Sequence, residues 1–367
     1  MAKRFRTVIG AVAAISLLGG AAACGSSSSG GSGSAPLGHI KLVLGGPPST
    51  SLSLMVFGVA QQLGVWKQQG LDVEVNGIAG QATAAQELIS GQVQIATVGP
   101  ETFIQAVSSN KPAPIKAFYT WVRKATWDIA VPADSPVQSL ADLKGKTIGV
   151  AQIGKSDGKV AQAVIAQATG QQPADIKLLP VGNGASALQA LKKGQVAAYS
   201  DGDASAAQIQ GLGLPLRQIP LPTQYADASD VTFAASNSYF KDHSKQLIAF
   251  GKGWGEAVTF CKANIDACVK AYWKQYPVSK PPNADSDYAA ASVPFKAVLN
   301  ARLPKFFADD GKWGETNLNG WLEVAKVYAY QNVDPTKLAT YFTNEYVPQM
   351  STFDANTWTQ KANSYKG

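Results

Sequence analysis

A repeated motif constrains the fold of this chain more than any other feature of its sequence. Residues 88–93 (LISGQV) align with residues 191–196 (LKKGQV), and eight residues after the glycine of each motif comes another glycine, Gly99 and Gly202. Each copy has the pattern of a helix end, a glycine turn, a buried strand and a glycine at the carboxyl end of the strand. The repeat therefore predicts two similar α/β lobes. Because ligands of open α/β sheets bind at the carboxyl ends of the strands, we expect a cleft where the lobes face each other.

Short apolar segments alternate with longer amphipathic segments from His39 onward, which predicts an α/β fold with parallel sheets. From Lys245 the pattern becomes helical and carries an aromatic stripe that is interpreted as core packing. The stripe includes Phe250, Trp254, Trp321 and Tyr328. Helices are expected over 54–69, 83–90, 159–169 and 185–193. Strands are expected over 40–44, 71–75, 94–98, 115–119, 127–131, 147–151, 176–180, 196–200 and 231–235.

The first 23 residues have the layout of a secretory signal: basic residues without an acid, a short apolar run over 8–18, and small residues over 19–23. Cys24 follows directly, which is typical of a bacterial lipobox, although position 21 is alanine where leucine is usual. Ordinary signal peptidase would cut at the same bond. The Gly/Ser-rich run over 25–35 predicts a flexible tether. We expect a body anchored to a membrane through lipid on Cys24, with free secretion as the alternative.

The formal charge of the whole chain is +7, and loss of the three basic signal residues leaves +4. The remaining lysines and arginines form no block, and no nucleic-acid-binding motif accompanies them, so nucleic-acid partners are not expected. The chain has two histidines and three cysteines, with no CxxC pair, so neither a metal site nor a cofactor is expected.

Two motifs nevertheless fit enzyme patterns. Residues 154–158 (GKSDG) match the nucleophile elbow G-x-S-x-G, and Asp201 or Asp230 and then His243 follow in the chain order of a hydrolase triad. Residues 182–187 (GNGASA) match the dinucleotide pattern G-x-G-x-x-A, with Asp201 nineteen residues beyond the first glycine. Both patterns arise easily in a chain with 35 glycines, and an exported protein meets little NAD. We expect no enzymatic activity and keep a secreted hydrolase that uses Ser156 and His243 as an alternative.

Three segments resemble a known family. Residues 60–75 (AQQLGVWKQQGLDVEV), residues 134–146 (DSPVQSLADLKGK) and residues 188–196 (LQALKKGQV) are similar, in this order, to the nitrate/sulfonate/taurine and thiamine-precursor solute-binding proteins of ABC importers. The resemblance covers about residues 39–280.

The resemblance implies a two-lobed periplasmic-binding-protein-like fold of type II, with strand crossovers near 121–128 and 225–231 and a helical C-terminal region. It also implies a monomer that binds a small-molecule ligand and delivers it to an ABC permease and its ATPase. A ligand sensor without transport is the remaining alternative. The expected division is a signal peptide (1–23), a lipidated Gly/Ser tether (24–38), the first lobe (39–122), the second lobe (123–229) and a return to the first lobe with C-terminal helices (230–367).

Ligand contacts are expected in the glycine-rich loops that follow the strands. Backbone N–H groups at a helix N-terminus can hold a polar or anionic group without a charged side chain, and nearby hydroxyls add donors. The ligand-binding residues expected from these loops and the first crossover are Ser49, Thr50, Ser51, Gln81, Thr83, Gly99, Pro100, Glu101, Trp121, Gly154, Lys155, Ser156, Asp157, Asn183, Gly184 and Asp201.

The charge of the ligand stays open at this point. Lys155 or Arg123 could pair with a sulfonate-type anion, whereas Glu101, Asp157, Asp201 and Asp203 would repel it and favour an amine or a nitrogen heterocycle such as a thiamine-precursor pyrimidine. Trp121 and Trp127 could stack on a flat ring.

Once Cys24 is assigned to lipid, Cys261 and Cys268 remain, in a compartment where disulfides persist. On one continuous helix their Cα atoms would be about 10.5 Å apart, which is too far for a bridge. Asn264 has the pattern of a helix stop followed by a new N-cap. We therefore predict a helix break and a disulfide between Cys261 and Cys268.

Overall fold

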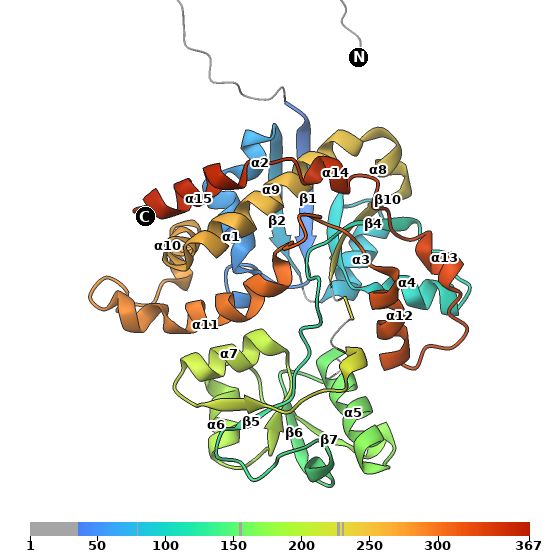
Figure 1. Ribbon diagram of the computed structural model, residues 1–367, viewed down its shortest axis with the longest axis vertical. Helices are drawn as coiled ribbons and strands as arrows, with labels where there is room; N and C mark the ends of the chain where they lie inside the picture. Colours follow the sequence, from blue (N-terminus) through green and yellow to red (C-terminus); the bar gives the residue numbers. More distant parts are fainter. Residues whose placement is uncertain (1–35, 79, 154–155, 226–227, 230) are drawn as a thin grey trace, which may run out of the picture. The chain divides into compact units, whose positions relative to one another are not determined.

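The computed structural model describes residues 36–367 except 79, 154–155, 226–227 and 230. The expected signal peptide, Cys24 and most of the tether lie outside the described residues. Within them, two five-stranded sheets organise the chain, in the orders β2-β1-β3-β10-β4 and β7-β6-β8-β5-β9. We call the first sheet with its covering helices the first lobe, and the second sheet with its helices the second lobe (Figure 1).

The first lobe is built mainly from the N-terminal third of the described chain. Its strands are β1 (Gly38–Leu44), β2 (Leu71–Gly77), β3 (Ile95–Val98), β4 (Ile115–Thr120) and β10 (Thr232–Ser236). The segments between them contain η1 (Leu52–Leu54), α1 (Met55–Leu63), α2 (Val65–Gln68), α3 (Gln81–Ile89) and α4 (Pro100–Ser108). The single helix expected over 54–69 is divided at Gly64, whose φ of 61° is left-handed and ends α1.

The second lobe repeats this arrangement. Its strands are β5 (Ala130–Pro132), β6 (Thr147–Val150), β7 (Lys177–Pro180), β8 (Ala198–Tyr199) and β9 (Leu216–Gln218). Its helices are η2 (Ala141–Leu143), α5 (Ser156–Thr169), η3 (Pro173–Asp175), α6 (Ala185–Lys192), α7 (Asp203–Gly211) and η4 (Thr223–Tyr225). In both copies of the sequence repeat a helix ends, a glycine with positive φ follows (Gly91 or Gly194), and the next helix begins directly after Gly99 or Gly202.

The expectation of purely parallel sheets was wrong. β1 pairs in parallel with β2 and β3, and β6 with β7 and β8, but β10 is antiparallel to β3 and β4, and β5 is antiparallel to β8 and β9. The reversed strands are the two that follow a crossover: the chain leaves the first sheet after Thr120, enters the second at Ala130, and returns from it to Thr232. A strand that arrives from the opposite lobe enters its sheet from the cleft side, so it runs against the strands that end there.

The C-terminal third is helical and packs largely on the first lobe. Its elements are α8 (Asn237–Asp242), α9 (Ser244–Ala263), α10 (Ile265–Gln275), η5 (Pro277–Ser279), α11 (Tyr288–Phe306), α12 (Leu318–Val327), α13 (Pro335–Ala339), α14 (Val347–Met350) and α15 (Ala355–Ser364). None of the helices in the described part of the chain is long and apolar enough to span a membrane.

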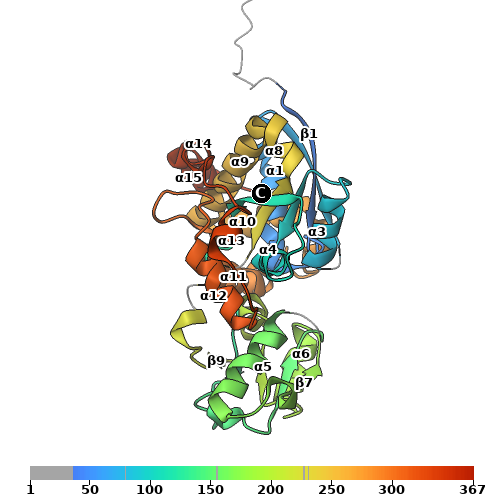
Figure 2. The same ribbon diagram turned by 90° about the vertical axis from the view of Figure 1, so that its right-hand side faces the viewer.

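The two faces of the first sheet belong to different parts of the core, because side chains alternate along a strand. Ile40, Leu42 and Leu44 of β1 pack with α1, α9 and α10, whereas Val43 packs with α3 and α4 on the other face. Figure 2 shows α9 and α3 on opposite sides of β1. The core thus fixes the direction in which the loops after these strands leave the sheet.

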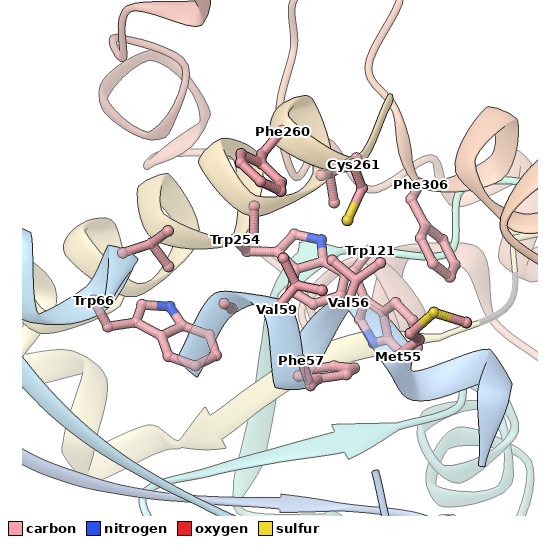
Figure 3. Packing of buried hydrophobic residues seen from close by; sticks show 14 of the residues in the cluster. Met55, Val56, Phe57, Val59, Trp66, Trp121, Trp254, Phe260, Cys261 and Phe306 are labelled. Carbon is pink, nitrogen blue, oxygen red and sulfur yellow. The ribbon is translucent and has the colours of Figure 1, made fainter. Parts of the chain in front are cut away.

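Aromatic rings fill the centre of the first core cluster. The ring of Trp254 lies 4.4 Å from that of Phe57 and 5.4 Å from that of Trp121, and Phe306 packs against both tryptophans (Figure 3). Phe250, Trp254 and Trp321 are fully buried, which confirms that the aromatic stripe is core.

The expected helix break and disulfide are both present. α9 ends at Ala263, Asn264 is extended with φ −150°, and its side chain accepts a hydrogen bond from the N–H of Ala267 at the start of α10. This reversal brings the Cα atoms of Cys261 and Cys268 to 4.8 Å, and the two residues are disulfide-bonded.

Candidate functional site

A cavity of about 810 Å³ lies between the loops of the two lobes. On the first lobe it is lined by residues that follow β1, β2 and β3, and on the second by residues that follow β6, β7 and β8. The two crossovers form part of its wall and are joined to each other, since the N–H groups of Trp121 and Val122 both donate to the carbonyl of Val231 at 3.1 Å. The cleft predicted at the strand carboxyl ends is therefore present.

Most of the expected ligand-binding residues reach this cavity. Those that line it are Thr50, Ser51, Gln81, Pro100, Glu101, Trp121, Asp157, Asn183, Gly184 and Asp201.

Three expected residues do not line the cavity. Ser49 uses its carbonyl to accept a hydrogen bond from the hydroxyl of Ser279, Thr83 is exposed on α3, and Gly99 is the buried N-cap residue of α4. Gly154 and Lys155 lie outside the described residues. Ser156 begins α5.

Several lining residues were not expected from the sequence. Thr97 is the penultimate residue of β3 and Gln208 lies on α7, so the repeat could have pointed to both. Arg302 on α11 and Tyr328 directly after α12 come from the C-terminal helices, more than 60 residues after the second crossover, and no local signal marks them. Tyr328 was assigned to the core stripe, but it is half-buried and faces the cavity.

Buried polar contacts hold the lining loops in place. The N–H of Gly45 donates to the hydroxyl of Thr97 at 3.0 Å, which fixes the loop after β1. The hydroxyl of Tyr199 donates to the carbonyl of Gly182 at 2.9 Å. Gly184 then adopts φ 54° and ψ −121°, a conformation that side-chain-bearing residues rarely adopt, and α6 begins at the next residue. The loop before α6 therefore presents Asn183 and Gly184 to the cavity.

Trp121 belongs to the core as much as to the site. It is 4% exposed and stacks on Phe233 with ring centroids 5.7 Å apart. Trp127 and Tyr328, which both line the cavity, meet edge to face at 6.2 Å. Trp127, which is 8% exposed, and the half-buried Tyr328 form an aromatic wall of the cavity.

The charged residues that line the cavity, among the residues that the structure describes, are Glu101, Asp157, Asp201 and Arg302. Arg302 already forms an ion pair, with its Nε 2.8 Å from Oδ1 of Asp203. Lys305, one turn further along α11, pairs with the other carboxylate oxygen of Asp203. The lining therefore contains three carboxylates and one guanidinium that is paired with a fourth carboxylate.

Acidic residues also occupy the first turns of helices that begin at the cavity. Glu101 lies in the first turn of α4, Asp157 in that of α5 and Asp203 in that of α7. A carboxylate there offsets the partial positive charge of the helix N-terminus, which would otherwise attract an anion. The first turns of α3 and α6 contain no acid, so their N–H groups remain suited to polar atoms of a ligand.

Asp128, at the start of the second lobe, is a buried carboxyl behind this acidic surface. It is 4% exposed, and its carboxyl oxygens have no hydrogen-bond partner among the described residues. Burial raises its pKa well above the usual value, the carboxylates of Asp203 and Asp157 raise it further, and Lys305 and Arg302 oppose the shift. These surroundings favour the protonated form of Asp128.

Arg123, one of the two cations considered for an anion, is paired elsewhere. Both of its terminal nitrogens bind the carboxylate of Asp310, at 3.0 and 2.9 Å. The hydrogen bond from Arg123 lowers the pKa of Asp310 to about 2. Arg123 does not line the cavity, and Lys155 lies outside the described residues.

The residues of the hydrolase alternative are not brought together in the described structure. His243 is exposed, its ring stacks on that of Tyr239 at 4.3 Å, and it does not line the cavity that Asp157 and Asp201 share. Asp230 lies outside the described residues.

Two mixed sheets, two crossovers and a cavity between facing loops define a periplasmic-binding-protein-like fold. A family model described as NMT1/THI5 like matches residues 53–267, more than half of the chain, and the chain belongs to this family. None of the curated proteins matches the chain.

Solved structures share the fold at low sequence identity. The alkanesulfonate-binding protein SsuA from Xanthomonas axonopodis pv. citri, bound to MOPS, is 17% identical, with a TM-score of 0.59 over 84% of this chain and 99% of its own. The periplasmic nitrate-binding protein NrtA from Synechocystis PCC 6803 is 12% identical, with a TM-score of 0.60 over 90% and 98%. A DszB mutant in complex with biphenyl-2-sulfinic acid is 12% identical, with a TM-score of 0.54 over 85% and 98%. These likenesses concern the fold, and they confirm the resemblance to sulfonate- and nitrate-binding proteins.

Proposed function

We propose that this protein is an extracytoplasmic solute-binding protein of an ABC importer, which captures a small organic molecule in the cavity and delivers it to a permease and its ATPase. Membership of the NMT1/THI5-like family and the fold shared with alkanesulfonate- and nitrate-binding proteins support this function. The lipobox-like sequence before Cys24 supports attachment to the outer face of the cell membrane through a lipid on that cysteine. The protein is proposed to act as a monomer and to perform no chemistry on its ligand.

The charged residues that line the cavity are the basis for the proposed class of ligand. Glu101, Asp157 and Asp201 face the cavity, and the one guanidinium in the described lining is paired with Asp203. Among the residues that the structure describes, an alkanesulfonate or nitrate in the cavity would meet three carboxylates and one cation that is already paired with Asp203. An amine or a protonated nitrogen heterocycle would instead gain charge-assisted hydrogen bonds. The ligand is therefore proposed to be a nitrogen compound, such as a thiamine-precursor pyrimidine.

The aromatic wall supports a flat ligand. Trp127 comes from the first crossover and Tyr328 from the region after α12, so a ring packed against both would contact two distant parts of the chain. Stacking on such side chains favours a planar, electron-poor or cationic ring.

Binding is coupled to closure because the two lobes contribute different parts of the site. Contacts to Gln81 and Glu101 of the first lobe and to Asp157 and Asn183 of the second are made together only when the lobes approach. A ligand that contacts both lobes shifts an open–closed equilibrium toward the closed form by its difference in affinity for the two states. The closed form is the signal that a permease would distinguish.

A thermal-shift panel tests this function, since a ligand that binds the folded state alone raises the unfolding temperature by mass action. The panel contains aminopyrimidines, polyamines, sugars, alkanesulfonates and nitrate. A nitrogen compound is expected to stabilise the protein. Asp157→Asn and Asp201→Asn are each expected to weaken its affinity roughly tenfold or more, as loss of a charged hydrogen bond does, and so to reduce the thermal shift. Stabilisation by a sulfonate, undiminished in these variants, would overturn the ligand class. Stabilisation by no member of the panel would count against the solute-binding function itself.

A further inference from the structure

Two cations stand beside the cavity and share one carboxylate. Arg302 and Lys305 lie one turn apart on α11 and pair with the two oxygens of Asp203 in the first turn of α7. The three side chains are well shielded, with exposed fractions of 12% for Arg302, 21% for Lys305 and 6% for Asp203. Arg302 lines the cavity, so Asp203 offsets the charge of a cation that a ligand in the cavity would meet.

The backbone fixes this triad at the first crossover. The N–H of Asp203 donates to the carbonyl of Thr126 at 2.8 Å, and Nζ of Lys305 donates to the carbonyl of Ala125 at 2.6 Å. Thr126 itself lines the cavity. Asp203 is therefore anchored by its own backbone, independently of the two cations that it binds.

Small side chains on α7 let it approach α11 closely enough to form the pairs. Ala204 and Ala207 pack on Val298, and a Cβ at Gly211 would lie 2.7 Å from the Cα of Pro294. Figure 1 shows α7 of the second lobe lying along α11. The ion pairs thus join the second lobe to a helix of the C-terminal region and belong to a packed contact.

We propose that Asp203 determines the charge selectivity of the cavity by pairing with Arg302 and Lys305, so that neither cation is left to bind an anionic ligand. This inference rests on the proposed function in one respect, that the cavity is where a small ligand binds. With Asp203 in place, the guanidinium that faces the cavity has its charge offset, and the carboxylates of Glu101, Asp157 and Asp201 set the sign of the site. Without the Asp203 carboxylate, Arg302 and Lys305 lose the group with which they pair, and a small anion that enters the cavity can take its place.

The test is the isosteric variant Asp203→Asn, titrated with methanesulfonate and with nitrate by thermal shift and calorimetry. The variant is expected to bind methanesulfonate roughly tenfold more tightly than the unmodified protein, a difference of 1.4 kcal/mol. Asp203→Glu keeps the carboxylate and is expected to behave like the unmodified protein. Adding Arg302→Gln to Asp203→Asn is expected to remove the gain, because it removes the cation that faces the cavity.

Asp310→Asn is the matched control. It also removes one carboxylate from an arginine pair, that of Arg123, and it changes the net charge of the protein by the same amount. Arg123 does not line the cavity, so Asp310→Asn is expected to leave anion binding unchanged. Equal anion affinity in Asp203→Asn and Asp310→Asn would overturn the inference, as would a gain that persists after Arg302→Gln.

Because loss of the shielded Asp203 carboxylate could prevent folding, a second variant tests the same expected gain in methanesulfonate affinity. Asp203→Asn combined with Lys305→Gln leaves a single cation without its partner, and circular dichroism establishes that the variant is folded. It is expected to retain the gain in methanesulfonate binding, and a folded double variant without that gain would also overturn the inference. This test can be read independently of the proposed function, because the anion titrations need no natural ligand. If no nitrogen compound in the panel bound, the difference in anion affinity between Asp203→Asn and Asp310→Asn could still be measured.

Discussion

The stability of this protein is expected to depend on pH through one buried glutamate. Glu256 lies on α9, is 5% exposed, and accepts a hydrogen bond from Nε2 of Gln69 at 2.8 Å. Burial raises its pKa from 4.5 to about 7, against smaller opposing effects of Trp358, Lys361 and Gln69. Between pH 4.5 and about pH 7, the folded protein therefore keeps a proton on Glu256 that the unfolded chain has lost.

The sign and size of the effect follow from this difference. The pKa of Glu256 is higher in the folded protein than in the unfolded chain, so Glu256 contributes its full stabilisation below pH 4.5. This contribution to the free energy of unfolding is lost as the pH rises to about 7. At 1.36 kcal/mol for each pKa unit, the loss is about 3 kcal/mol. Glu256→Gln removes the charge while it keeps the oxygen that accepts from Gln69, so the variant is expected to lack this loss.

Urea unfolding of both proteins between pH 4.5 and pH 8 measures the effect. The free energy of unfolding of Glu256→Gln, minus that of the unmodified protein, is expected to rise by about 3 kcal/mol across this range. Groups that titrate equally in both proteins cancel in the difference. Glu345→Gln provides the control, because it makes the same substitution at an exposed glutamate. A flat difference for Glu256→Gln would refute the argument from burial.

Three further changes test the packing that positions the site. Replacing both Cys261 and Cys268 with alanine opens an eight-residue loop and is expected to lower the free energy of unfolding by about 2.5 kcal/mol, measured in urea. If reduction of the unmodified protein left its urea midpoint unchanged, the disulfide would not contribute this stability. Trp254→Ala removes a fully buried ring from the aromatic cluster and is expected to cost about 3–5 kcal/mol, so a loss below 1 kcal/mol would show that the cluster is not close-packed. Tyr199→Phe leaves the carbonyl of Gly182 without its donor and is expected to cost about 1 kcal/mol and to weaken ligand binding; an unaltered affinity would show that this hydrogen bond does not position the loop.

The sequence predicts the elements of this fold well where the signal is local. The strand segments contain the observed strands to within a few residues, because each strand is a short apolar run bounded by glycine or polar residues. β9 was missed, since Leu216–Gln218 is three residues long and carries no alternating pattern. Gly64 could have been recognised as a break, but the apolar periodicity on either side of it predicts one continuous helix.

Long-range features were less accessible to sequence analysis. The direction of β5 and β10 depends on the lobe from which each strand arrives, which no residue within the strand encodes. The loop residues of the candidate site were predictable because glycine-rich turns after strands are local. Arg302 reaches the cavity because Ala204, Ala207 and Gly211 let α11 approach α7, and this contact joins segments about 90 residues apart. Asp203 was expected to repel anions, but its ion pairs with two cations from α11 could not be foreseen.

Calorimetric titration of the unmodified protein tests most directly whether the cavity binds a nitrogen compound or an anion. An aminopyrimidine or another nitrogen compound is titrated in one experiment and an alkanesulfonate in the other, at the same pH and ionic strength. We expect saturable binding of one nitrogen ligand per chain and no measurable heat of binding for the sulfonate. Tight, saturable binding of the alkanesulfonate would contradict it.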